Sequence, residues 1–133
     1  PNTIPKFIEF DKLPLPTSIR PDITLRAVWW ISPSQVWIGG GTLLRWDGSN
    51  LNLMPLANQG QLREITAIWG TGPNDVWLTG DDGGIWHYTG TLPVPRLQSG
   101  FAEPLYGIAG NQVDGKNEVI FVGSGGAILR YSP

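Results

Sequence analysis

The chain contains no cysteine, a single histidine and few charged residues, which make up 15% of its 133 positions. The absence of cysteine excludes disulfides, thiolate catalysis and cysteine-ligated zinc or iron–sulfur sites. The single histidine, His87, excludes a metal site built from several imidazoles. A formal net charge of −2 offers no attraction to nucleic acid or to anionic lipid. We therefore expect no cofactor, no metal and no nucleic-acid partner.

Long apolar runs are absent as well. No stretch approaches the ~18–20 apolar residues that a membrane-spanning helix needs, so we expect no membrane span. The chain starts at Pro1 without a methionine or a signal-peptide pattern, as a processed mature chain or an excised fragment would. Few lysines and seven tryptophans favour an extracellular or periplasmic location.

Glycine, proline and tryptophan are abundant, with 18, 12 and 7 residues, which suits short strands joined by tight turns. Three similar segments recur about every forty residues. Their first strands read LRAVWWI from Leu25, ITAIWG from Ile65 and LYGIAG from Leu105. Equivalent positions in the second and third strands are Val36, Val76 and Val119, and Trp46, Tyr88 and Tyr131. The chain is therefore predicted to repeat one structural unit three times.

Each copy is expected to form one small antiparallel sheet. Apolar residues occur at both odd and even positions of the strands, and so on both of their faces. This is typical of a sheet that is covered on both sides. Fourth strands are expected at 51–56 and at 92–95, after the first and second copies. No such segment follows the third copy, but 7–15 has the composition of an outer strand. We therefore treat 1–133 as one region, with repeats at about 25–57, 65–98 and 105–133 and a permuted outer strand at 7–15.

Four-stranded antiparallel units of ~40–45 residues are typical of β-propeller blades. The expected fold class is all-β, with three blades per chain and the N-terminal strand completing a C-terminal blade. Three blades are fewer than the ~4–8 that close a ring. Either the chain is part of a longer one, or several copies close the ring together. Two copies would supply six blades, with each N-terminal strand completing the last blade of the other copy.

The second copy carries the fullest motif, ITAIWGTGPNDVWLTGDDGGIWHYTG over residues 65–90. Its VW-x-x-G and G-x-I-x-H-Y-x-G elements resemble the blades of a bacterial β-propeller repeat family of secreted and surface proteins. The resemblance covers residues 25–133 and implies a propeller fold. It implies no single function, because such repeats serve scaffolding, glycan binding and enzyme-accessory roles.

A basic residue recurs at one place in the third strand of every copy, as Arg45, His87 and Arg130. A charge inside an otherwise apolar sheet needs a partner, because an unpaired buried charge costs several kcal/mol or more. One interpretation is a structural salt bridge or hydrogen bond to a neighbouring blade, for which Asp75 and Glu118 are candidate partners. The other is an anionic or polyol ligand held by each blade in turn.

Trp30 stands where the other two copies have Gly70 and Gly110. A large aromatic side chain at this place suits a ligand platform or an interface anchor. The candidate ligand- or partner-binding residues are therefore Trp30, Arg45, His87 and Arg130.

The chain offers no catalytic motif. A Gly-x-Ser-x-Gly elbow is absent, and nothing in the sequence brings a serine to His87. We therefore expect a non-enzymatic interaction or scaffold module, acting as an accessory subunit or as part of a larger assembly. Its partner would be another protein or a further copy that completes the ring. Two alternatives stay open, a lectin-like multivalent binder of glycans or small ligands and a fragment of a larger propeller enzyme.

Overall fold

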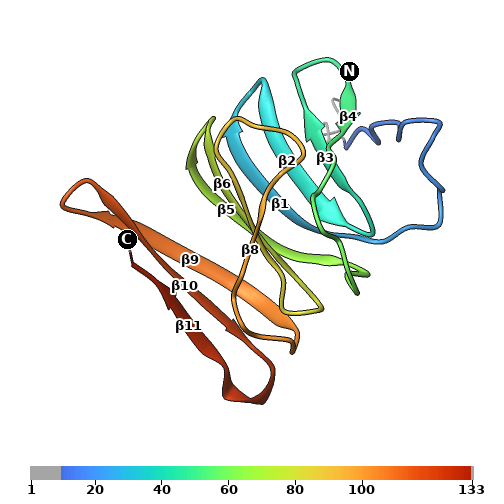
Figure 1. Ribbon diagram of the computed structural model, residues 1–133. Coiled ribbons are helices and arrows are strands. Elements are labelled where there is room, and N and C mark those ends of the chain that lie inside the picture. The colour runs from blue at the N-terminus through green and yellow to red at the C-terminus, as the bar shows by residue number, and fades with distance from the viewer. Residues whose placement is uncertain (1–9, 133) are drawn as a thin grey trace, which may run out of the picture.

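The chain folds into three antiparallel sheets in the computed structural model, which describes residues 10–132 (Figure 1). The first sheet contains β1 (Leu25–Ser32), β2 (Gln35–Gly40), β3 (Leu43–Trp46) and β4 (Leu51–Leu53). The second contains β5 (Ile65–Gly72), β6 (Asp75–Gly80), β7 (Ile85–Tyr88) and β8 (Arg96–Leu97). The fourth strand of this sheet thus follows the segment 92–95 where it was predicted, and Val94 forms only an isolated bridge to Leu56. The third contains β9 (Leu105–Val113), β10 (Lys116–Gly123) and β11 (Ile128–Tyr131), with the 3-10 turn η1 (Ser124–Gly126) before β11.

The predicted all-β class is confirmed. In each sheet, strands that are consecutive in the chain pair side by side and antiparallel. No helix in residues 10–132 is long and apolar enough to cross a membrane.

The third sheet has three strands in the described part of the chain, and β11 forms its edge. The outer strand expected at 7–15 does not complete it there: residues 10–15 belong to no strand, and 7–9 lie outside the described residues. Residues 10–24 lead directly into β1 of the first sheet. The second sheet lies between the first sheet and β11, so within one chain residues 10–15 lie on the side of the molecule away from β11 (Figure 1).

The three sheets stack in chain order, with the second sheet in the middle (Figure 1). Their first strands are neighbours, since β1 contacts β5 and β5 contacts β9. One apolar cluster fills the space between the first and second sheets and includes Trp37, Ile68 and Trp86. A second cluster, with Trp77 and Phe121, fills the space between the second and third sheets. The middle sheet is therefore covered on both faces, which explains why its strands lack a polar side.

The turns after the third strands contain the glycines that tight hairpins require. Gly48 has φ +100° and Gly90 has φ +111°, values that residues with a Cβ rarely adopt. In the first of these turns, Asp47 also accepts hydrogen bonds from the backbone N–H groups of Ser49 and Asn50. These bonds, the Asn50 one foremost, lower the pKa of the Asp47 carboxyl. Both glycines thus have a positive φ, although β7 and β8 are joined by the longer segment 89–95 and not by a tight hairpin.

Candidate functional site

Each sheet has two faces, because alternate residues of a strand point to opposite sides. We call the face that is directed toward the next sheet in chain order the trailing face, and the opposite one the leading face. The trailing face of each sheet carries Trp29, Trp37 and Leu43 in the first, Trp69, Trp77 and Ile85 in the second, and Ala109, Ile120 and Ile128 in the third. The leading face carries Val28, Trp30 and Ile38 in the first, Ile68, Gly70 and Leu78 in the second, and Ile108, Gly110 and Phe121 in the third. Inside the molecule, each trailing face packs on the leading face of the next sheet.

The two internal contacts repeat one another in detail. The Trp37 and Tyr88 rings lie 4.8 Å apart at 57° in the first contact, and the Trp77 and Tyr131 rings lie 4.8 Å apart at 54° in the second. The sheets therefore stack by a single rule, in which a tryptophan of a trailing face meets a tyrosine of the following leading face.

A second tryptophan of the trailing face lies over a glycine of the next sheet. Trp29 Nε1 donates a 3.0 Å hydrogen bond to the carbonyl oxygen of Gly70. A Cβ added at Gly110 would lie 2.6 Å from Cη2 of Trp69, so only glycine leaves room for that ring. At Trp69 and Gly110, the large side chain on one sheet is thus matched by a missing side chain on the other.

The leading face of the first sheet is open along β1. Val28 is 65% exposed, whereas the equivalent Ile68 is 6% exposed under the preceding sheet. Leu25 and Trp30 are exposed on the same face. Farther out on this face, Leu44 of β3 is already buried, so the open area is confined to the innermost strand.

The trailing face of the third sheet is open as well. Ile128 is 72% exposed, whereas the equivalent residues Leu43 and Ile85 are 2% and 6% exposed. Ile120 and Val122 on β10 are also exposed. Both ends of the stack therefore present apolar side chains at positions that are buried wherever a neighbouring sheet is present.

The recurring basic residues do not meet in one pocket. Arg45 lies between the first two sheets, with its guanidinium carbon 5.7 Å from the centre of the Trp37 ring, and its Nη1 donates a 3.3 Å hydrogen bond to the Tyr88 hydroxyl. Arg130 lies on the open trailing face, where its Nη2 donates a 2.6 Å hydrogen bond to Oε1 of Glu118. The two arginines are thus separated by the second and the third sheet.

His87 faces the third sheet and is held by an aromatic ring and a carboxylate. Its ring stacks on Trp77 at 3.8 Å, and its Nε2 lies 2.6 Å from Oδ1 of Asp75. Asp75 also accepts hydrogen bonds from Thr71 and, across the sheet interface, from Nδ2 of Asn117. An acidic partner is present in two of the three copies. The prediction that it comes from a neighbouring sheet is wrong, because Asp75 and Glu118 lie on the strands that pair with those of His87 and Arg130 in the same sheet.

Asp75 is the centre of this polar cluster. Its partial burial, the largest single influence, acts to raise the pKa of its carboxyl. The hydrogen bonds from Thr71, His87 and Asn117, together with the charge of His87, outweigh that influence. The pKa of Asp75 therefore lies below its usual value of 3.8. This carboxylate links the second sheet to the third through Asn117, a role that its position in the repeat does not indicate.

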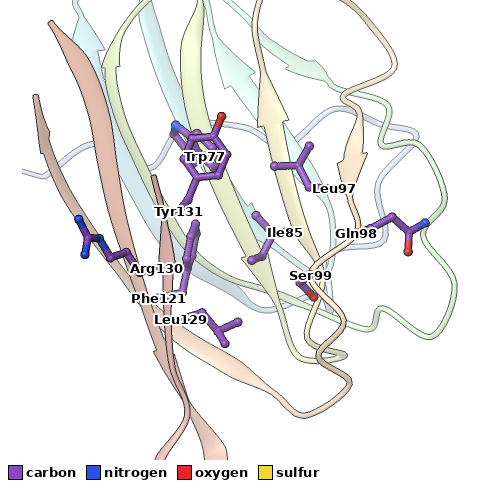
Figure 2. Close-up of a pocket in the computed structure, with 9 residues that line it drawn as sticks. All are labelled: Trp77, Ile85, Leu97, Gln98, Ser99, Phe121, Leu129, Arg130 and Tyr131. Carbon is purple, nitrogen blue, oxygen red and sulfur yellow. The ribbon is translucent and has the colours of Figure 1, made fainter. Parts of the chain in front are cut away.

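A cavity of about 220 Å³ opens between the second and third sheets, beside the free edge of β11 (Figure 2). Its wall is largely apolar, with Trp77, Phe121 and Tyr131 among the lining side chains, and Gln98 and Ser99 supply polar atoms. Figure 2 shows the Arg130 side chain directed away from Tyr131 and Leu129. Of the four predicted binding residues, only Arg130 borders this cavity.

The metal-ligating side chains of residues 10–132 do not gather in one place. No group of three or more His, Asp or Glu side chains in this range is placed to hold a metal ion. Among the same residues, the hydrogen-bond partner of the His87 ring is the carboxylate of Asp75, and no hydroxyl nucleophile is bonded to it. The prominent features of the molecule are its two open faces, its cavity and the free edge of β11.

Comparison of the chain with protein-family models, with curated proteins and with solved structures gives no match.

Proposed function

We propose that this chain is a non-enzymatic interaction module made of β-propeller blades, and that it acts by burying its two open sheet faces against protein. The carrying observation is the contrast between equivalent positions. Val28 and Ile128 are largely exposed, whereas Ile68, Leu43 and Ile85 at the same places in the repeat are buried. Leaving such apolar area in water is unfavourable by about 25 cal/mol per Å². Contiguous exposed apolar surface of this kind marks protein interaction sites.

The arrangement of the sheets supports the propeller part of this proposal. Three small antiparallel sheets stack by one repeated rule, and their first strands lie next to one another as blades do around an axis. The free edge of β11 offers unpaired backbone groups to an added strand, as in β-strand addition. In this proposal the partner supplies that strand.

A binder of glycans or small ligands is the second candidate function. The cavity beside Trp77 and Tyr131 favours it, because aromatic rings with a few polar groups nearby suit such ligands. A lectin-like molecule of this type would bind in every blade. The third alternative, a fragment of a larger propeller enzyme, requires catalytic residues outside this chain and stays a prediction.

The burial of the open faces can be tested by cysteine labelling, because the chain has no cysteine of its own. Single variants Val28→Cys and Ile128→Cys place a thiol on each open face. Ser49→Cys, in the exposed β3–β4 turn, is the matched control. In a native extract of the producing cells, we expect maleimide to label Val28→Cys and Ile128→Cys at least tenfold more slowly than Ser49→Cys.

Equal labelling rates for all three variants in the native extract would overturn the proposal that these faces bind protein. Labelling in urea provides the reference, since all three thiols should then react alike. For the second candidate, binding of a glycan or small ligand that survives replacement of Trp77 and Tyr131 would exclude the cavity as the site.

A further inference from the structure

At one pair of positions, the two open faces differ from the internal faces in ways that compensate. Inside the molecule, Trp29 and Trp69 on the trailing faces lie over Gly70 and Gly110 on the leading faces. On the open trailing face, the position of Trp29 and Trp69 is occupied by Ala109. On the open leading face, the position of the two glycines is occupied by Trp30. On the open faces, the large residue is thus on the leading face and the small residue on the trailing face, the reverse of the internal contacts.

We infer that a second copy of this chain covers both open faces, with Trp30 of each copy packed on Ala109 of the other. The inference rests on the proposed function and names the partner. An added blade of the ordinary kind would bring a tryptophan against Trp30 and leave a hole over Ala109. Only a partner with the reversed pair fits both faces, and this chain carries that pair.

The neighbouring positions show the same reciprocal fit. Ile120 replaces the Trp37 and Trp77 of the internal trailing faces, and Trp46 replaces the tyrosines that those rings meet. Val122 stands where the first sheet has Gly39, whose missing side chain makes room for Ile65 and Ile68. The smaller Val28 stands at the place of Ile68. A larger residue on one open face thus again meets a smaller one on the other.

The same contact surfaces are available in the isolated chain. Internal neighbours meet through the first strand of the following sheet and the first two strands of the preceding one, as β1 and β2 contact β5, and β5 and β6 contact β9. The equivalent contact between copies places β9 and β10 on β1. The exposed Val28, Trp30 and Ile120 lie on these strands. Ile128 lies beside them on β11, at the place of Leu43 and Ile85, which are buried in the internal contacts.

The number of copies follows from the number of blades. Two copies bring six sheets, within the ~4–8 that close a propeller, whereas three copies bring nine. In a two-copy ring the contact between trailing and leading faces occurs twice, related by the two-fold axis. A substitution in the contact therefore changes the free energy of dissociation of the dimer twice, once for each contact.

The test replaces Trp30 and Ala109 by the glycine and the tryptophan that the internal contacts have at these positions. We expect sedimentation equilibrium of the purified full chain to give a particle of two 14.5 kDa chains. Trp30→Gly removes the large side chain, and Ala109→Trp sets two indoles against each other. Each should raise the dimer dissociation constant by roughly a hundredfold, about tenfold per contact. The double variant Trp30→Gly, Ala109→Trp restores the internal pairing and should recover dimerisation to within about tenfold of the original.

Both positions are exposed in the isolated chain, so neither substitution disturbs its core. Leu92→Ala removes an exposed apolar side chain from the segment between β7 and β8 and should leave the dissociation constant unchanged. A purified chain that is monomeric, or a particle of three or more copies, would overturn the inference. So would a dimer that is unaffected by the single variants, or a double variant that is no better than Ala109→Trp alone.

A monomeric purified chain would leave the proposed function standing if Val28→Cys and Ile128→Cys are still protected in the native extract. A different protein would then cover the faces. Fast labelling in the extract would overturn both the inference and the proposed function.

Discussion

At the scale of single residues, the polar groups of this chain are used to join sheets. Asp75 receives hydrogen bonds from its own sheet and from Asn117 of the next. Arg45 reaches from the first sheet to the Tyr88 hydroxyl of the second. These contacts fix the position of each sheet relative to its neighbour, because hydrogen bonds depend on direction more strongly than apolar contacts do.

The lowered pKa of Asp75 predicts an acid-dependent loss of stability. Because the carboxyl has a lower pKa in the folded chain than its usual 3.8, its ionised form stabilises the fold above that pH. The contribution is lost as the pH falls from 3.8 through the lower folded-state pKa. Asp75→Asn should therefore lower the free energy of unfolding by about 1–3 kcal/mol at pH 6, and the difference from the original chain should shrink below pH 3.8.

Urea unfolding at several pH values measures this dependence. Asp11→Asn, which changes an exposed carboxyl in the segment before β1, is the matched control and should be neutral throughout. A constant difference between Asp75→Asn and the original chain from pH 6 to pH 2 would contradict the assignment.

At the scale of elements, each strand is shaped by what packs across it as well as by its own residue preferences. The Trp69 ring on β5 requires glycine at position 110 on β9. Gly39 on β2 likewise leaves room for Ile65 and Ile68 on β5. Glycine weakens an isolated strand, so these positions show that the fit between sheets outweighs local strand preference.

Gly110→Ala should lower the free energy of unfolding by about 1–3 kcal/mol, because its Cβ would lie 2.6 Å from Trp69 and 2.8 Å from the carbonyl oxygen of Glu118. Gly72→Ala is the matched control. It also lies in β5, at the end of a strand, but its Cβ would have no neighbour within 4 Å. Denaturant unfolding should show Gly72→Ala at or slightly above the stability of the original chain. Equal losses for the two variants would mean that general strand effects, and not the contact with Trp69, set the cost.

At the scale of the whole molecule, three stacked sheets have two ends that nothing in residues 10–132 covers completely. Stacked repeats contact only their neighbours, so the terminal faces depend on a partner or on a polar surface. In this chain they are apolar.

If the ends are covered by a second copy, thermal stability must depend on protein concentration, since dilution favours the open monomer. We expect the Tm of the original chain to rise by several degrees between about 1 and 100 μM. Ile128→Lys puts a charge on the open trailing face without touching the core and should remove this dependence. A Tm of the original chain that does not change with concentration would exclude stabilisation by association.

Much of the architecture was predictable from local patterns. The forty-residue recurrence at Leu25, Ile65 and Leu105 predicts the strands, because equivalent residues in a repeat occupy equivalent places. The turn glycines at positions 48 and 90 predict the hairpins, because their φ values follow from local geometry. The exposure of Trp30 also agrees with its prediction as a contact residue, although its binding role stays a prediction.

Other features depend on which sheets face each other. The exchange between Trp30 and Ala109 involves residues in sheets at opposite ends of the stack, and neither residue alone indicates its partner. Comparison of the position of Trp29 and Trp69 across the copies would have shown Ala109 as the exception. The separation of Arg45, His87 and Arg130 could not be found in this way, because equivalent positions in a repeat have different neighbours at its ends.

The sequence by itself determined the all-β class, the strand order within each repeat and the turns, since these depend on short-range periodicity and on backbone preferences. Tertiary structure alone decided which faces are buried, why Gly110 must lack a side chain and where the basic residues find their partners. The physical reason is that stacking brings together side chains some forty positions apart, and their volumes and hydrogen bonds are matched only across that contact.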